Sequence, residues 1–161
     1  MLKVGEYVVY KRNVCKIKHI KEINTKKYYV LEPIDDKSLT ISVLYDENST
    51  LLRKIISKEE CEKLINSIPA IDIIDSNDKS IENEYKKLFS TGLLEDLIKI
   101  IKTTYVRNND RISNHKKISE KDDNYFNKAE QLLYNELSIC LNKTYEETKN
   151  YIIDRVESLK K

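Results

Sequence analysis

The chain has 161 residues, of which 35% are charged and 40% hydrophobic, so it can form one ordinary domain or two small ones. No apolar run approaches the roughly 20 residues of a membrane-spanning helix, and the first residues lack the apolar core of a signal peptide, so we expect a cytoplasmic protein without a membrane segment. The net charge of +2 hides two basic zones, because residues 1–57 carry +4 and 86–121 carry +5, whereas 58–85 carry −5 and 122–161 carry −2.

Such basic zones attract polyanions by electrostatic steering and counterion release. Modest zones of this size are also common on proteins that never touch nucleic acid. The charge pattern therefore leaves nucleic-acid binding open as one function among several.

Residues 1–56 predict a small β module. Four segments are rich in β-branched and aromatic residues and are bounded by turn residues, as expected of strands: EYVVY, VCKIKHI, KYYVLEPI and LTISVLY. In the last segment every second residue is predicted to face the core: Leu39, Ile41, Val43 and Tyr45. Four or five strands in so short a span indicate a strongly bent sheet or an SH3-like barrel.

The first predicted turn, Lys11-Arg12-Asn13, contains no glycine and places two positive charges at its tip. Tight turns usually need a residue that tolerates a positive φ, and asparagine tolerates it better than most. We therefore expect Asn13 to take the place of glycine. His19 falls in an alternating strand and is expected at the surface.

Helical spacing replaces strand alternation after Ile56. Three capping signals each open a helix: Ser57 with Glu60, Ser119 with Asp122, and Thr144 with Glu147. A further helix covers IENEYKKLFSTG and ends at Gly92. Another covers LLEDLIKIIKTTY, with one apolar face: Leu94, Leu97, Ile98, Ile101 and Tyr105.

Two segments of the second half look irregular. Pro69 closes the first helix, residues 70–80 form a joint, and the polar stretch 107–119 is predicted to be a long exposed loop. Residues 57–161 are thus predicted to be an all-α domain of about five helices. The fold class is α+β, with a β module followed by a helical domain.

Patterns that carry catalysis are missing from the sequence. With only two glycines no Gly-rich phosphate loop can form, both histidines are isolated, and no serine lies in a nucleophile elbow. The three cysteines lack metal-ligand spacing, which favours reduced and mostly buried thiols: Cys15, Cys61 and Cys140. We expect neither enzymatic activity nor a cofactor or metal.

Seven segments, in order along the chain, resemble the CarD-like transcription regulators, whose N-terminal module is shared with the transcription-repair coupling factor. They are KVGEYVVY (3–10), VCKI (14–17), YYVLEPI (28–34), LTISV (39–43), LRKIISKEECEKLI (52–65), IKTTY (101–105) and AEQLLYNEL (129–137). The resemblance implies a Tudor/SH3-like module that binds the β subunit of bacterial RNA polymerase. It also implies a helical domain that touches promoter DNA near the upstream edge of the melted region, so that the two together tune the open complex.

By this resemblance, Ser42 falls where relatives present a polar or basic polymerase contact on the outer face of the sheet. Ile23 is the nearest match to a second family contact. Lys11 and Arg12 are further candidates for contact with polymerase or DNA. The alternatives are surface solvation at Ser42 and an ordinary solubilising turn at the Lys-Arg pair.

The family typically wedges a Trp against the minor groove, but this chain has no Trp. Ile73 and Ile74 occupy the corresponding zone and could replace the wedge or simply pack the joint. Glu82 stands where the family has an Arg, whereas Tyr85 and Lys86 match the family. Phosphate contacts are predicted on the lysines of the second basic zone, with a solvated helix face as the alternative: Lys86, Lys87, Lys99 and Lys102.

Two other functions stay open. One is a protein–protein adaptor that binds no DNA, and the other is an RNA-binding small barrel that stacks bases on some of its 11 tyrosines. We expect a monomer whose binding to free promoter DNA is weak and largely non-specific, because a local net charge of +5 neutralises only a few phosphates.

Overall fold

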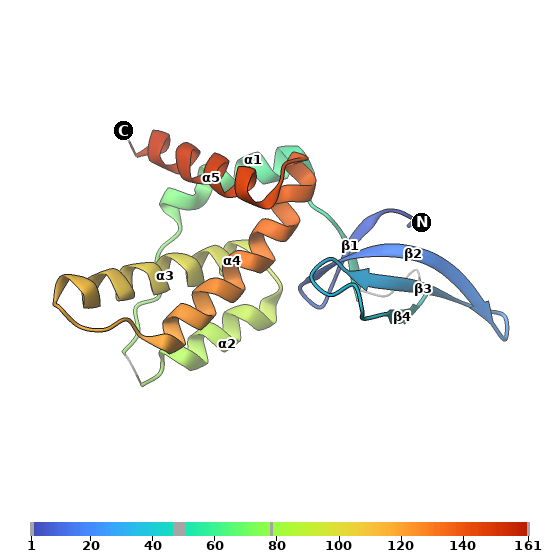
Figure 1. Cartoon of the computed structure of the whole chain (residues 1–161), viewed down its shortest axis with the longest axis horizontal. Helices are drawn as coiled ribbons and strands as arrows, with labels where there is room; N and C mark the ends of the chain where they lie inside the picture. Colours follow the sequence, from blue (N-terminus) through green and yellow to red (C-terminus); the bar gives the residue numbers. More distant parts are fainter. Residues whose placement is uncertain (1, 47–50, 78, 161) are drawn as a thin grey trace. The chain divides into compact units, whose positions relative to one another are not determined.

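The computed structural model describes residues 2–46, 51–77 and 79–160. The chain divides into two compact units, Met1–Ile56 and Ser57–Lys161. The N-terminal unit is an antiparallel sheet, and the helical unit contains five α-helices in the described residues (Figure 1). The predicted α+β class is confirmed.

The sheet contains five strands in the spatial order β4-β3-β2-β1-β5, with every neighbouring pair antiparallel. The strands are β1 (Tyr7–Tyr10), β2 (Asn13–Ile23), β3 (Lys26–Pro33), β4 (Ile41–Leu44) and β5 (Leu52–Lys54). Because this order puts β4 and β5 at opposite edges in the described residues, closure into an SH3/Tudor-like barrel stays a prediction.

One face of the sheet is the core of the N-terminal unit. Its buried members come from four strands: Val8, Cys15, Ile17, Tyr29, Leu31 and Val43. Ile41 and Tyr45 pack against this core as predicted, but Leu39 is 47% exposed. The prediction for Leu39 is wrong because β4 begins only at Ile41, so strand alternation does not extend to it.

A β-bulge between Ile17 and His19 sets which side chains of β2 face the core. Ile17 and Ile20 are three positions apart, so a regular strand would point them to opposite faces. The extra residue of the bulge turns both isoleucines to the same face, where they contact the core. His19 is exposed, as the sequence predicted.

The first hairpin turn differs from the prediction. Tyr10 pairs with Asn13, so Lys11 and Arg12 are the two central residues, and their φ values are 46° and 76°. Positive φ at both central positions is the signature of the type I′ turns that fit twisted hairpins. The expectation that Asn13 replaces glycine is therefore wrong, because Asn13 is already the first residue of β2.

The described residues of the helical unit form six elements. They are α1 (Lys58–Ser67), the short 3₁₀ helix η1 (Ile68–Ala70), α2 (Ile81–Thr91), α3 (Leu94–Ser113), α4 (Glu120–Leu141) and α5 (Tyr145–Leu159). Every helix in the described residues is too short or too polar to cross a membrane. The largest fully buried apolar side chains of this unit come from α1, α2, α3 and α4: Ile65, Ile81, Tyr85, Ile100 and Leu137.

The three predicted capping signals and the predicted end of α2 are confirmed. Ser57 and Thr144 each accept a backbone hydrogen bond from the glutamate three residues on, and that glutamate accepts one in return. Ser119 accepts from the Asp122 N–H, and Gly92 ends α2 with a φ of 73°.

The predicted loop at 107–119 is wrong, because α3 continues to Ser113. The buried side of this helix is partly polar. Thr103 and Thr104 are buried with their hydroxyls donating to backbone carbonyls one turn earlier, and Arg107 reaches Asp122. A helix held by polar contacts shows no apolar periodicity, so its last two turns could not be recognised from spacing.

Candidate binding surfaces

The outer face of the sheet is defined by rows of side chains on β2, β3 and β4 that point away from the core. His19, Val30 and Ser42 lie side by side in one row. The next row is Lys21, Tyr28 and Leu44. His19 and Ser42 are exposed beside the buried Val30. Ser42 is therefore placed where a substitution changes the surface and leaves the core intact.

Ile23 belongs to the same outer face. It lies two residues beyond Lys21 on β2, pairs with Lys26, and is 48% exposed. Lys11 and Arg12 lie at the other end of β2, before its first residue. The structure thus brings Ser42 and Ile23 to one face and separates the Lys-Arg turn from both.

Lys11 folds back over its own hairpin. Its Nζ lies 5.4 Å from the centroid of the Tyr10 ring, within the range of a cation–π contact.

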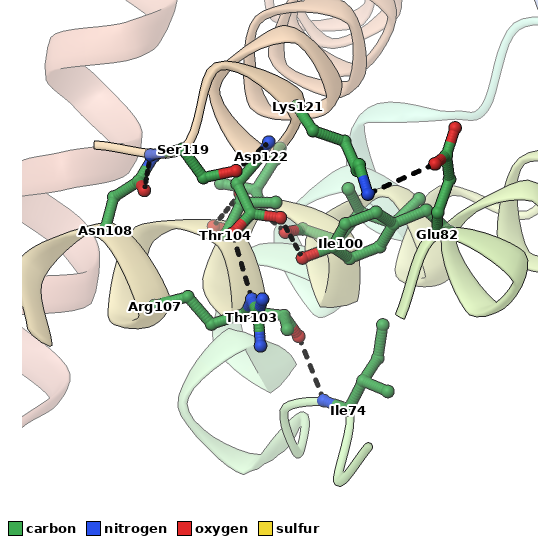
Figure 2. Close-up of polar contacts among 12 residues, drawn as sticks. Ile74, Glu82, Ile100, Thr103, Thr104, Arg107, Asn108, Ser119, Lys121 and Asp122 are labelled. Atoms are coloured by element: carbon green, nitrogen blue, oxygen red, sulfur yellow. Dashed lines mark hydrogen bonds and ion pairs between the residues drawn. The ribbon is translucent and has the colours of Figure 1, made fainter. Parts of the chain in front are cut away.

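The joint before α2 is tied to α3 by polar contacts, as Figure 2 shows. The Ile74 N–H donates to Thr103 Oγ1 at 2.9 Å. That hydroxyl donates in turn to the Lys99 carbonyl at 2.7 Å. Ile73 is 42% exposed, whereas Ile74 is half-buried. Of the two isoleucines that could replace the family tryptophan, Ile73 is the one that presents its side chain to solvent.

Lys102 has a structural partner on the same joint. Its Nζ donates to the Ile68 carbonyl at 2.7 Å and also to the Ile71 carbonyl. Burial lowers the pKa of Lys102, and the carboxylate of Asp72 opposes that shift. The ammonium group thus binds the carbonyls at both ends of η1. This favours a structural role for Lys102 over contact with a phosphate.

Tyr85 is fully buried and cannot present its ring at the surface. Its hydroxyl donates to Asp122 Oδ1 at 3.0 Å, and Arg107 Nε donates to Asp122 Oδ2 at 2.9 Å. Burial raises the pKa of Tyr85, and the Asp122 carboxylate raises it further. This triad joins α2, α3 and the first turn of α4. Tyr85 therefore has a structural role and is not accessible for direct contact with DNA.

The remaining lysines of the prediction lie on α2 and α3. Lys86 and Lys87 are well exposed, and their Nζ atoms lie 3.8 and 3.5 Å from carboxylate oxygens of Glu82 and Glu84. Lys99 is half-buried on α3. The neighbouring carboxylates weaken the positive potential at Lys86 and Lys87.

Sequence reasoning missed a basic pocket at the end of α3. Its volume is about 160 Å³, and its lining is polar: Arg107, Asp110, Arg111, Asn114 and Lys116. Three cationic side chains and one carboxylate line it, and Arg107 is also paired with Asp122. The only signal in the sequence was the net charge of the zone, because the missed helical turns hid the fact that Arg107 and Arg111 share a face four residues apart.

An apolar groove of about 410 Å³ lies among η1, α3, α4 and α5. Its wall includes Ile98, Ile101 and Tyr105, which the sequence predicted on one face of the helix, and Tyr105 is 59% exposed. Tyr105 lies one turn beyond Ile101, which also lines the groove. The predicted shared face is therefore present, and this stretch of it lines an open groove.

Within the described residues, no group of three or more His, Cys, Asp or Glu side chains is placed to hold a metal ion. Residues 2–56 match the family model of the CarD-like/TRCF RID domain, an RNA-polymerase-interacting domain. The match covers the N-terminal unit and stops at its boundary with the helical unit. No curated protein matches the chain.

Proposed function

Because the N-terminal unit belongs to the CarD-like/TRCF RID family of RNA-polymerase-interacting domains, we propose that this protein is a bacterial transcription regulator. It binds the β subunit of RNA polymerase through the outer face of the sheet. Its helical unit contacts promoter DNA near the upstream edge of the melted region. The protein acts in the cytoplasm by binding, without catalysis, and changes the lifetime of the open complex.

The family match carries the polymerase half of this proposal. The matched residues form a compact unit of their own. The surface that would bind polymerase is therefore formed without residues of the helical unit. Ser42 and Ile23, which the resemblance assigned to polymerase contact, lie on one face of that unit. A shared face is what two contacts to one partner require.

Two features of the helical unit support the DNA half. Its basic zone is separate from that of the sheet, and it includes the pocket lined by Arg107, Arg111 and Lys116. Ile73 is an exposed apolar side chain on a joint that is fixed to α3 by the Ile74 backbone. Apolar side chains held in this way can enter the minor groove and unstack a base step.

Polymerase binding is tested with Ser42→Glu in the full chain. The new charge lies in the row with His19, so it should weaken binding to purified polymerase in a pull-down without lowering thermal stability. The control is Asn124→Glu, which adds the same charge to an exposed position of α4. Equal binding by Ser42→Glu and the parent chain would move the interface away from the outer face.

The DNA contact is tested with Ile73→Ala, using Ile74→Ala as the matched control. If Ile73 wedges the groove, its truncation shortens open-complex lifetime while polymerase binding and melting temperature stay unchanged. The loss should be a few kcal/mol at most, because unstacking one step is of that size. Ile74→Ala should lower the melting temperature first, since this side chain is half-buried. An unchanged lifetime for Ile73→Ala would exclude the wedge.

A further inference from the structure

The apolar groove of the helical unit is lined by both buried and exposed apolar side chains. Ile98, Leu133 and Ile152 come from α3, α4 and α5, and each is at most 5% exposed. Tyr105 and Ile153 also line the groove, and they are 59% and 45% exposed. Its volume of about 410 Å³ lies within the range of small-molecule sites, which often form between packed helices. The groove can therefore remove the apolar part of a small ligand from water.

Lys102 brings a half-buried positive charge to the wall of this groove. Its Nζ donates to the carbonyls of Ile68 and Ile71, and because an ammonium group has three N–H donors, one is left for a further acceptor. In the part of the chain that the structure describes, no carboxylate lies at ion-pair distance from Nζ. Burial lowers the pKa of Lys102, as expected of a charge without a close counter-charge. Among the described residues, this ammonium group thus lacks the anionic partner that buried charges usually have.

The other charged side chains of the groove balance each other. Three lysines and two glutamates line it, which gives a net charge of +1. Lys149 Nζ lies 3.4 Å from Glu130 Oε1, and Glu157 and Lys160 add one charge of each sign. The charge that remains is that of Lys102. The groove is therefore complementary to a ligand that has one negative charge and an apolar body.

We propose that this groove binds a free medium-chain fatty acid, with its carboxylate at Lys102 and its hydrocarbon chain along the apolar side chains of α3, α4 and α5. The carboxylate accepts the third N–H of Lys102 in a charge-assisted hydrogen bond and supplies the counter-charge. The chain covers Tyr105 and Ile153, and each methylene that leaves water stabilises the complex. A chain of about ten carbons suits the volume of the groove, which is at the lower end of the range for ligand sites.

This site is separate from both surfaces of the proposed function. Ser42 and Ile23 belong to the other unit, and the basic pocket at the end of α3 shares no lining residue with the groove. Binding of the fatty acid can therefore be measured without polymerase or DNA. A negative result would overturn the fatty-acid site and leave the proposed function as it stands.

The test titrates the folded full chain with sodium decanoate below its micelle concentration, by calorimetry and by NMR of the backbone amides. We expect one site with a Kd of about 10–100 μM, a plausible affinity for a ligand of this size. Amide shifts should change around the groove and stay constant in the sheet. Decyltrimethylammonium has the same chain with the opposite charge, and butyrate has the carboxylate with a short chain. Both should bind at least about tenfold more weakly, because each lacks one of the two interactions.

Two variants locate the site. Ile153→Glu places a charge on an exposed part of the groove wall, so it should abolish decanoate binding while the chain stays folded. Ile112→Glu is the matched control, because Ile112 is 57% exposed on α3 and does not line the groove; it should bind like the parent chain. Lys102→Met should weaken decanoate at least about tenfold and remove the preference over decyltrimethylammonium. Circular dichroism shows whether each variant is folded, and if Lys102→Met unfolds, the two ligands of opposite charge still test the role of the charge in the parent chain.

Three results would overturn the proposal. They are no binding of decanoate at millimolar concentration, equal binding of decyltrimethylammonium by the parent chain, and unchanged decanoate binding by Ile153→Glu. Sedimentation of the parent chain and of Ile153→Glu covers the other occupant. A parent dimer that Ile153→Glu converts to a monomer, without decanoate binding to either, would show that a second copy of the chain covers the groove.

Discussion

The two residues at the tip of the first hairpin hold a backbone conformation that residues with a Cβ seldom adopt. Lys11 and Arg12 both have positive φ, and the left-handed region costs about 1–2 kcal/mol for such residues. Sequence reasoning counted a three-residue turn and assigned the strain to Asn13. Only the pairing register of Tyr10 with Asn13 shows where the turn begins. A strained tip that keeps two cationic residues supports their prediction as a contact site.

Replacing the strained pair should stabilise the N-terminal unit. Asn-Gly is the preferred sequence of a type I′ turn, so Lys11→Asn with Arg12→Gly should raise the free energy of unfolding by about 1–2 kcal/mol in urea titrations. Asn13→Gly is the control. It should lower stability by about 0.5–1 kcal/mol, because Asn13 lies in a strand with no need for positive φ. The reverse ranking would restore Asn13 as the turn residue.

Tyr85 matches the family in sequence, and its place in the structure explains the match through a buried hydrogen bond to Asp122. Removal of its hydroxyl in Tyr85→Phe leaves the buried Asp122 carboxylate with one hydrogen bond fewer. The free energy of unfolding should fall by about 1.5–3 kcal/mol, the usual value for a bond to a charged group. DNA affinity measured at a temperature where the variant is folded should not change. Normal stability with weakened DNA binding would return Tyr85 to the interface.

At the scale of elements, helix starts were predictable and one helix end was not. Ser57 and Thr144 each begin a helix with a capping box, which is formed with the glutamate three residues later and is therefore visible in the sequence. The end of α3 depends on Arg107 meeting Asp122 of another helix, a contact that no local pattern encodes. The bulge in β2 could not be predicted from local sequence either, because it is defined by the pairing of β2 with β3. Local chemistry is readable from a sequence, whereas contacts between elements need the fold.

The capping box of α5 should give stability a measurable pH dependence. Hydrogen bonds from the Thr144 backbone and side chain hold the pKa of Glu147 below its ordinary value of 4.5. A lowered carboxylate pKa contributes stability above the unfolded value and loses that contribution as the pH falls through the folded value. Glu147→Gln should therefore be less stable than the parent chain at pH 7, and the difference should vanish in strong acid.

Urea titrations of both proteins from pH 7 to pH 2.5 measure this difference. Glu146→Gln removes one charge from the same helical turn without breaking a capping bond, and it serves as the control for the helix dipole. A difference between Glu147→Gln and the parent chain that stays constant with pH would mean that the box is stabilised by its geometry and not by the charge of Glu147.

At the scale of the whole molecule, the proposed function divides binding between the two units, with polymerase bound by the sheet and DNA by the helices. A weak DNA contact by the helical unit gains effect when the sheet is bound to polymerase, because tethering raises the local concentration of DNA to the millimolar range. The charge zones of the sequence agree with this division, which the family resemblance implied. They could not predict which cations of the second zone act together, because the pairing of Lys86 with Glu82 and the pocket around Arg111 depend on helical turns and the fold.

The pocket at the end of α3 should therefore contribute more to DNA affinity than the lysines of α2. Arg111→Gln with Lys116→Gln removes two charges from a site lined by three cations and one carboxylate. The affinity for a promoter duplex should fall about tenfold at low salt, and the slope of log K against log salt should become shallower by about 2. Lys86→Gln with Lys87→Gln removes the same charge beside Glu82 and Glu84, and its effect should be smaller. Neither pair should alter binding to polymerase alone, which the other unit performs. A larger loss for the Lys86 and Lys87 pair would place the phosphate contacts on α2.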